Sequence, residues 1–276
     1  MFLSQPTIST HIKQLELELG VQLLVRSTKD VILSEAGLIF YPYAVQLLET
    51  EREALSQLHH REMKITGTVS ISTSSVPGNY MLPQFLAYIK EIHPDIRYRI
   101  SEGDSEKVIY EVMHFEAELG IGGMKSMADK CICEPLFEDE IVLITPNTER
   151  YRELNGKFPL EQLREERYVV RETGSGTKKF SENIERDLDL QDMKIAVQVE
   201  SSEMVKRAVE AKVGIAFISK LAVKDAVSQG RVLSFSFPKD TSKRQLYLLY
   251  HEDRVLTAAA RSTIKSLRHF CEDYKE

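Results

Sequence analysis

Apolar residues recur with helical spacing within the first twenty positions of the chain. They are separated by four, three and four positions: Ile8, Ile12, Leu15 and Leu19. This spacing forms one apolar stripe of a helix. Ser4 is a typical helix cap, Pro6 fits a first helical turn and Gly20 is a typical stop. The pattern predicts a short amphipathic helix over residues 4–20.

Two short apolar runs follow, over residues 21–26 and 31–33, with a polar tip between them. They predict a two-stranded wing. A helix is predicted from Ser34 to about Glu62, with apolar residues near heptad spacing at Tyr41, Val45, Leu48 and Leu55. Pro42 lies inside this helix and predicts a kink, because proline removes one ladder hydrogen bond. Thr66-Gly67 ends the helical pattern.

Beyond Gly67 the pattern alternates between period two and period 3.6. The predicted strands are 68–73, 96–100, 118–123, 140–145, 168–172, 194–200, 214–219, 232–237 and 245–251. The predicted helices are 79–92, 105–115, 177–188, 202–212, 220–230 and 255–274. The alternation restarts after Pro146. We therefore expect an α/β fold of two doubly wound lobes, with the last strand and helix returning to the first lobe.

Composition narrows the class of protein. The apolar and charged fractions, 42% and 28%, are typical of a soluble globular protein. No apolar run approaches a membrane span and the first residues do not resemble a signal peptide, so we expect a cytoplasmic protein without a membrane partner. The net charge of −6 is unfavourable for nucleic-acid binding. Any attraction to phosphate must therefore come from locally placed cations.

The residues typical of catalysis or metal binding do not form a persuasive set. The cysteines are odd in number, Cys131, Cys133 and Cys271, and a Cys-x-Cys pair is too tight for zinc without further ligands. We expect free thiols, no metal and no cofactor. Residues 174–177 lack the spacing of a phosphate-binding P-loop, and residues 120–123 lack the dinucleotide fingerprint. We find no paired carboxylates and no catalytic triad, and expect no enzyme activity.

The polar face of the first predicted helix can enter a major groove, where amides and hydroxyls contact base edges and cations contact phosphate. The same face is also what an ordinary solvated helix presents. The candidate DNA contacts are Gln5, Pro6, Thr7, Ser9, Thr10 and Lys13, with Arg26 and Lys29 at the wing.

The sequence from Leu3 to Gly37, "SQPTIS…I..LE..LG..L..R……L.E.AG", resembles the winged helix-turn-helix of the LysR-type transcriptional regulators. Thr10 stands where that family often has arginine, and Leu24 where it usually has phenylalanine. The resemblance starts near the end of the family's second helix. Since that helix supports the reading helix, we expect this chain to have a partial DNA-binding head and to bind operator DNA weakly.

The motifs "GTVSIS", "YVVRETGSGTKKF" and "VESSEMVKRAVEAKVGIAFIS" resemble the effector domain of the same family, which is built like a type 2 periplasmic binding protein. The resemblance implies a partial head over residues 1–34 and a linker helix over 35–65 that pairs in a homodimer or homotetramer. Effector lobe I would comprise 66–145 and 246–276, and lobe II 146–245. Lys212 replaces a glycine that is usual in the family.

Four predicted strand ends are rich in hydroxyls and glycine, over residues 73–78, 102–105, 173–177 and 201–203. Each precedes a predicted helix, so free N–H groups and hydroxyls lie at the positive end of a helix dipole. Each alone is also an ordinary cap. Together with the resemblance they predict a cleft for a small anionic effector. The expected contacts are Ser74, Ser75, Val76, Thr145, Gly174, Ser175, Thr177, Ser201, Ser202 and Phe217.

Two functions follow as hypotheses. The first is a transcriptional regulator that binds operator DNA and is gated by the effector. The second is a cytoplasmic small-molecule-binding module without DNA-binding activity.

Overall fold

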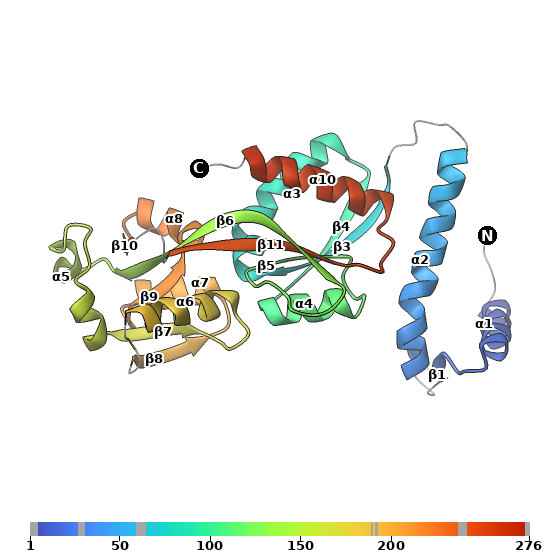
Figure 1. The fold of residues 1–276 in the computed structure, drawn as a ribbon, viewed down its shortest axis with the longest axis horizontal. Helices are drawn as coiled ribbons and strands as arrows, with labels where there is room; N and C mark the ends of the chain where they lie inside the picture. Colours follow the sequence, from blue (N-terminus) through green and yellow to red (C-terminus); the bar gives the residue numbers. More distant parts are fainter. Residues whose placement is uncertain are drawn as a thin grey trace. The chain divides into compact units, whose positions relative to one another are not determined.

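The computed structural model describes residues 5–26, 31–58, 65–188, 190, 193–236 and 242–273. The chain divides into two compact units, Met1–Met63 and Lys64–Glu276. Figure 1 shows the elements of both.

The first unit contains the predicted helix, wing and long helix. Helix α1 (Gln5–Leu19) ends before Gly20, and strands β1 (Leu24–Arg26) and β2 (Val31–Leu33) pair antiparallel. Helix α2 (Glu35–Leu58) continues past Pro42 without a break, and the kink there stays a prediction. The predicted end of this helix lies outside the described residues. The wing is joined to α1 because the Glu16 carboxylate accepts bonds from the backbone N–H of Leu23 and Leu24, at 2.8 and 3.0 Å.

Lobe I of the second unit is built on a parallel core of three strands. Strand β3 (Gly67–Ser74) lies between β4 (Ile96–Gly103) and β5 (Leu119–Gly122). A π-helical turn (Pro77–Met81) leads into α3 (Leu82–Ile92), which packs with α10 (Ala258–Asp273) against one side of the sheet. Helix α4 (Ser105–Met113) packs in a separate cluster with β11. The predicted strands and helices of this lobe are confirmed.

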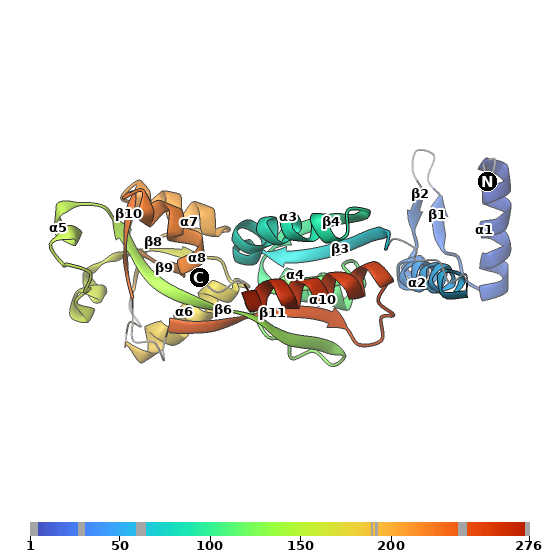
Figure 2. The same cartoon turned by 90° about the horizontal axis from the view of Figure 1, so that it is seen from above.

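Lobe II repeats the plan with β7 (Arg167–Arg171) and β8 (Lys194–Val199) in parallel, and β9 (Ala216–Ser219) and β10 (Val232–Phe235). Helix α6 (Gly176–Asp187) covers one side, whereas α7 (Ser202–Glu210) and α8 (Lys220–Ser228) cover the other (Figure 2). The short helix α5 (Glu149–Arg152) and a 3-10 helix (Leu160–Glu165) are additions that the sequence pattern did not predict.

Two long strands connect the lobes, β6 (Cys131–Pro146) and β11 (Lys243–His251). Residues of β6 up to Glu140 pair antiparallel with β11, and from Ile141 onward β6 pairs antiparallel with β9 and β10. The pattern predicted only residues 140–145 of β6, because the earlier half carries carboxylates and is only partly buried. The sheet is therefore mixed rather than purely parallel. The expected α/β fold with two lobes, the last strand and helix returning to lobe I, is confirmed.

Candidate functional site

A small hollow, open to solvent, lies where the two lobes meet. Lobe I contributes Ser74, Ser75, Val76, Asp104, Ser105 and Gly123. Lobe II contributes Arg171, Ser175, Gly176 and Thr177, and the connecting strand β11 contributes Arg244. Three of the four predicted strand ends thus line one hollow, and the fourth reaches it through Ser202. This convergence follows from topology, because carboxyl ends of parallel strands meet at one edge of a sheet.

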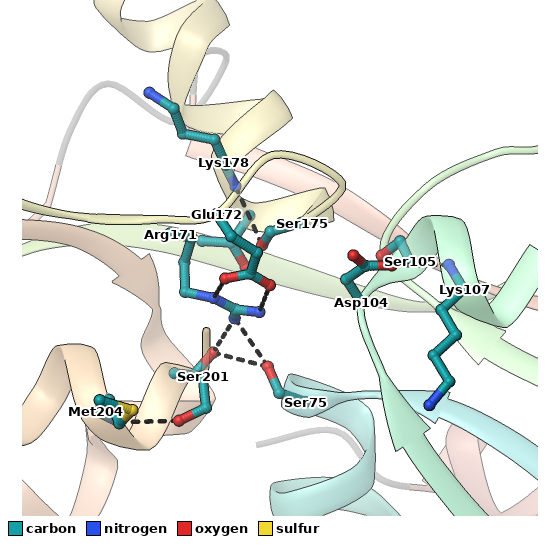
Figure 3. A network of polar contacts seen from close by, with 12 residues as sticks. Ser75, Asp104, Ser105, Lys107, Arg171, Glu172, Ser175, Lys178, Ser201 and Met204 are labelled. Carbon is teal, nitrogen blue, oxygen red and sulfur yellow. Dashed lines mark hydrogen bonds and ion pairs between the residues drawn. The ribbon is translucent and has the colours of Figure 1, made fainter. Parts of the chain in front are cut away.

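Three helices begin beside this hollow, each with a polar cap. Asp104 caps α4 by accepting from the Lys107 N–H at 2.7 Å. Ser175 caps α6 and Ser201 caps α7, the latter accepting from the Met204 N–H at 3.1 Å. Figure 3 shows these caps around the central arginine. The converging helix N-termini make the local potential more positive, which favours oxyanions.

Arg171 lies at the centre of the polar network and is buried. Its Nη1 donates to the hydroxyl of Ser75 at 2.8 Å and to that of Ser202 at 2.9 Å, and the two hydroxyls lie 3.1 Å apart. Its Nε and Nη2 donate to the two carboxylate oxygens of Glu172, at 2.9 and 2.7 Å (Figure 3). The Arg171 guanidinium therefore connects a hydroxyl of lobe I with one of lobe II, and the neighbouring Glu172 carboxylate balances its charge.

Arg244 of β11 forms a second buried ion pair with Asp139, its cross-strand partner on β6. Its Nε and Nη2 contact Asp139 Oδ2 at 2.8 and 2.7 Å, and its Nη1 donates to Thr177 Oγ1 at 3.0 Å. The other oxygen of Asp139 accepts from the Ser219 hydroxyl at 2.7 Å. Both arginine charges of the hollow are thus balanced by carboxylates of the chain itself.

A second small hollow lies in lobe II and shares Arg171 and Thr177 with the first. Its other lining residues are Tyr168, Val169, Val170, Lys178, Ser181, Glu185 and Phe217. The rings of Tyr168 and Phe217 stack, with centroids 5.9 Å apart. At its rim Lys178 Nζ lies 3.7 Å from a Glu185 oxygen. The two hollows together form a polar compartment beside a partly aromatic one.

A second contact between the lobes lies outside both hollows. The Tyr80 hydroxyl donates to Glu203 Oε2 at 3.0 Å, and Lys206 Nζ lies 2.6 Å from the same oxygen. Burial, and then the Glu203 charge, raise the pKa of Tyr80 well above its ordinary value. Burial acts to raise the pKa of Glu203, but hydrogen bonds from Lys206 and Tyr80 outweigh it, and the net pKa is lowered. This pair is therefore ionised Glu203 with neutral Tyr80.

Five predicted effector contacts, Ser74, Ser75, Val76, Ser175 and Thr177, line the first hollow, and Phe217 lines the second. The Ser202 hydroxyl joins them through Arg171, whereas Ser201 is an α7 cap.

Gly174 and Thr145 lie differently from the other predicted contacts. Gly174 has φ +93°, and a Cβ there would come 2.6 Å from Asp104 Oδ2, so glycine permits the lobes to approach. Thr145 is buried in β6 opposite Leu233, donates to the Pro146 carbonyl, and lines neither hollow.

The sequence pattern did not identify two arginines of the first hollow, Arg171 and Arg244, as site residues. The pattern treats a charged residue at a strand end as solvated, and nothing local tells that Arg244 would meet Asp139 across a hundred residues. A signal did exist for Arg171, because it ends an apolar strand directly before the predicted glycine turn.

The candidate DNA contacts of α1 are only partly described. Pro6, Thr10 and Lys13 are exposed, and Thr7 and Ser9 are half-buried. The Thr10 hydroxyl donates to the Pro6 carbonyl at 3.0 Å. The side chains of Gln5 and Arg26, and all of Lys29, lie outside the described residues. The opposite stripe is uncovered at its ends, with Ile8 46% and Leu19 41% exposed.

The three cysteines are free thiols, as expected. Burial raises the pKa of Cys131 to about 11 and that of Cys271 to about 12, so both are protonated at neutral pH. Within the described ranges, no group of three His, Cys, Asp or Glu side chains is placed to hold a metal ion. None of the helices in the described part combines the length and apolar character that a membrane crossing demands.

Comparison with known families identifies both units. Residues 64–272 match the LysR substrate binding domain, and residues 1–38 match the bacterial regulatory helix-turn-helix of the lysR family. The chain belongs to the LysR family of transcriptional regulators. It is therefore a LysR-type regulator with an effector-binding domain, and its relatives are named as regulators rather than enzymes.

Two relatives illustrate the likeness along the chain. The HTH-type transcriptional regulator YeiE of Escherichia coli K12 is 31% identical over 259 residues, which cover 94% of this chain and 86% of the relative. The HTH-type transcriptional regulator CysL of Bacillus subtilis is 27% identical over 252 residues, covering 91% and 83%.

Solved structures share the fold. A full-length OxyR variant from Pseudomonas aeruginosa superposes with a TM-score of 0.77 at 17% identity, covering 98% of this chain and 86% of its own. The QuiR effector-binding domain in complex with shikimate gives 0.69 at 15%, covering 77% and 100%. The Synechocystis CcmR regulatory domain in complex with 2-PG gives 0.68 at 18%, covering 76% and 99%. At these identities the LysR effector fold is what they share.

Proposed function

We propose that this LysR regulator is gated by a small anionic metabolite that binds in the first hollow, between the lobes. The observation that carries the proposal is Arg171, whose guanidinium contacts Ser75 of lobe I and Ser202 of lobe II at once. An oxyanion that enters here meets hydroxyls from both lobes and three helix N-termini. The related folds with shikimate and 2-PG carry small oxygen-rich ligands, which supports the same class here.

Binding would act by replacing one set of interlobe bonds with another. The Ser75–Arg171–Ser202 bonds hold the lobes in the arrangement described above. An effector oxygen that accepts from Arg171 Nη1 competes with both hydroxyls, so the ligand favours a different lobe angle. The proposed effector contacts are Ser74, Ser75, Val76, Ser175, Thr177 and Ser202. Gly174 and Ser201 shape the wall of the first hollow and Phe217 lines the adjoining second hollow. Thr145 acts indirectly, as part of the lobe II sheet.

Resident carboxylates set the affinity for the anion. Glu172 already occupies Nε and Nη2 of Arg171, and Asp104 adds a further negative charge to the wall. Each carboxylate repels an incoming anion. Glu172→Gln removes one charge while keeping the shape, so it should tighten anion binding, whereas Arg171→Gln should weaken it.

The test is a thermal-shift screen of the full chain with phosphate, sulfate and small mono- and dicarboxylates. A ligand at one hundred times its Kd stabilises the bound state by about 2.7 kcal/mol, which is readily measured. Ser202→Leu should abolish the shift, and the matched control Ser228→Leu, exposed at the end of α8, should retain it. A shift that survives Ser202→Leu would place the ligand elsewhere, and no shift with any anion would reject an anionic effector.

Operator binding is the second part of the proposal. The polar face of α1 would enter the major groove through Gln5, Pro6, Thr7, Ser9, Thr10 and Lys13, with Arg26 and Lys29 on phosphate. Because the stripe behind this face is uncovered at Ile8 and Leu19, we expect weak operator affinity from this chain. The regulator works in the cytoplasm, where operator DNA lies.

The uncovered stripe also favours the alternative of a cytoplasmic binding module without DNA-binding activity. A fluorescence-anisotropy titration with operator DNA of the family type separates the two. Nanomolar, sequence-specific binding by the 276-residue chain would reject both weak binding and the alternative.

We also place a homodimer or homotetramer contact on α2. Its apolar residues at heptad-like spacing include Tyr41, Leu48 and Leu55, and all three are exposed in the single chain. A paired copy of α2 would cover them.

A further inference from the structure

Two cysteines on strand β6 face each other across a short gap. Cys131 and Cys133 are two positions apart and so project from the same face of the strand. Their Sγ atoms lie 3.8 Å apart. Both side chains are half-buried, so solvent reaches the pair.

The pair packs mainly against apolar side chains, with the Ser126 side chain beside Cys131 and His251 opposite Cys131 on β11. Val108 and Val112 of α4, with Leu249 of β11, form the cluster against which both cysteines pack. Cys133 Sγ lies 3.9 Å from the Ser126 carbonyl and Cys131 Sγ lies 4.0 Å from the Ile132 carbonyl. These are weak thiol contacts that a stronger ligand displaces at little cost.

We propose that Cys131 and Cys133 together bind one thiophilic metal ion of the soft d¹⁰ class, through two thiolates. With the zinc–thiolate bond length of about 2.3 Å, sulfurs 3.8 Å apart enclose an angle of about 110° at the ion, and the longer bonds of a larger d¹⁰ ion such as Cd²⁺ give a somewhat smaller angle, so the pair can fill two corners of a tetrahedral site. Each thiol gives up its proton to solvent on binding. One divalent ion therefore displaces two protons, and the site stays neutral.

A disulfide fits this pair less well than a bridging ion. Strand residues i and i+2 have Cα atoms about 6.6 Å apart and nearly parallel side chains. A disulfide needs Cβ atoms about 3.8 Å apart, so it would require the strand to buckle out of its pairing with β11. A bridging ion leaves the sulfurs where they are.

The number of ligands decides which ions fit. Structural zinc takes four protein ligands, and in the described part of the chain no third His, Cys, Asp or Glu joins the pair. Soft ions that prefer sulfur above all other donors gain most from two thiolates, and water or a small thiol would complete their coordination. Hard ions such as Mg²⁺ gain nothing here.

The position of the site links it to the effector cleft. Helix α4 packs on the cysteines through Val108 and Val112, and its first residue Ser105 lines the first hollow. The cysteines therefore pack against the same helix whose N-terminus forms one wall of the first hollow.

The experiment is a Cd²⁺ titration of the reduced, metal-free full chain, followed by the ultraviolet sulfur-to-cadmium charge-transfer absorption and by proton release. The expected result is one ion per chain with two protons released. Cys131→Ser and Cys133→Ser should each lower the affinity about 100-fold, whereas Cys271→Ser, which removes the buried thiol of α10, should leave it unchanged.

Melting curves of each variant report whether it folds, and Cys133→Ala serves as a second variant if a serine destabilises the strand. An unchanged Cd²⁺ affinity in either serine variant, or no charge-transfer band from the unaltered chain, would overturn the proposal. Loss of the band in Cys271→Ser alone would do the same. None of these outcomes depends on the effector, so the proposed gating is tested separately.

Discussion

The helices of both units carry apolar stripes, but these stripes are buried in one unit and exposed in the other. In Lys64–Glu276 the apolar stripes of the helices pack into the cores, and Phe85 and Ile89 of α3 are fully buried against α10 and the sheet. In Met1–Met63 comparable residues are exposed, with Ile8 46% and Leu48 56% accessible. Periodicity therefore predicts which face of a helix is apolar, but says nothing about what covers that face.

The difference indicates where each unit finds its packing partner. The effector unit is complete within one chain, since strands and helices far apart in sequence meet around its cores. The first unit has a long helix whose apolar face is not covered by the described residues of the single chain. A second copy is the partner that heptad-like spacing best fits.

The largest expected effect is that of Leu48→Glu on α2, which tests whether this helix pairs with a second copy. In a two-fold dimer the substitution removes one buried leucine from each copy. The two together contribute about 3–6 kcal/mol to the free energy of association, so the dimer Kd should rise by about two to four decades. Sedimentation velocity over a concentration series measures it. Thr50→Glu, about 160° round the same helix, is the control and should leave the dimer intact. Equal weakening by both would place the contact on another face.

Next in size is Phe85→Ala in the core of lobe I. Loss of a fully buried ring should lower the free energy of unfolding by about 3–5 kcal/mol. Leu17→Ala on exposed α1 should change it by no more than about 0.5 kcal/mol. Denaturant unfolding followed by circular dichroism compares the two, and similar losses would show that the face of α1 that carries Leu17 is covered after all.

A smaller effect is expected where the lobes touch. A Cβ on Gly176 would lie 2.8 Å from Ser105 Oγ and 2.9 Å from the Gly123 carbonyl, so Gly176→Ala should cost about 1–3 kcal/mol and weaken effector binding. Gly122→Ala is the control, because its nearest neighbour would be Ser105 Oγ at 3.7 Å. The two variants should differ in both melting temperature and ligand-induced shift; if they behave alike, the lobes do not approach this closely in solution.

The smallest effect concerns Tyr80 and Glu203. Tyr80→Phe removes one hydrogen bond to a half-exposed carboxylate and should cost about 1 kcal/mol. The folded pKa of Glu203 lies below its ordinary 4.5, so the bond contributes fully above that pH and is lost as pH falls through the folded pKa. Unfolding curves from pH 7 to pH 3 should show the gap between the two proteins closing in acid. A gap that widens in acid would contradict the assignment.

Site residues could be predicted from the sequence where a single strand end places them. They could not be predicted where their position depends on contacts between elements far apart in the chain. Ser75 and Ser175 were predicted because each follows a strand and opens a helix, and this local pattern places both at the cleft. Arg244 was not, since its pairing with Asp139 depends on two strands about a hundred residues apart. Thr145 was expected at the cleft, but β6 has already crossed into the lobe II sheet at that position.

Strand β6 has one further consequence. Because a single strand belongs to the sheets of both lobes, and its ladder with β11 extends to the pair Glu140 and Lys243, prising the lobes apart would cost several backbone hydrogen bonds at once. Rotating the lobes about the strand axis costs less free energy, because β-strands are already twisted and tolerate further twist. Effector binding would therefore rotate one lobe against the other about β6 rather than separate them. The quantity to compare between ligand states is the interlobe rotation angle.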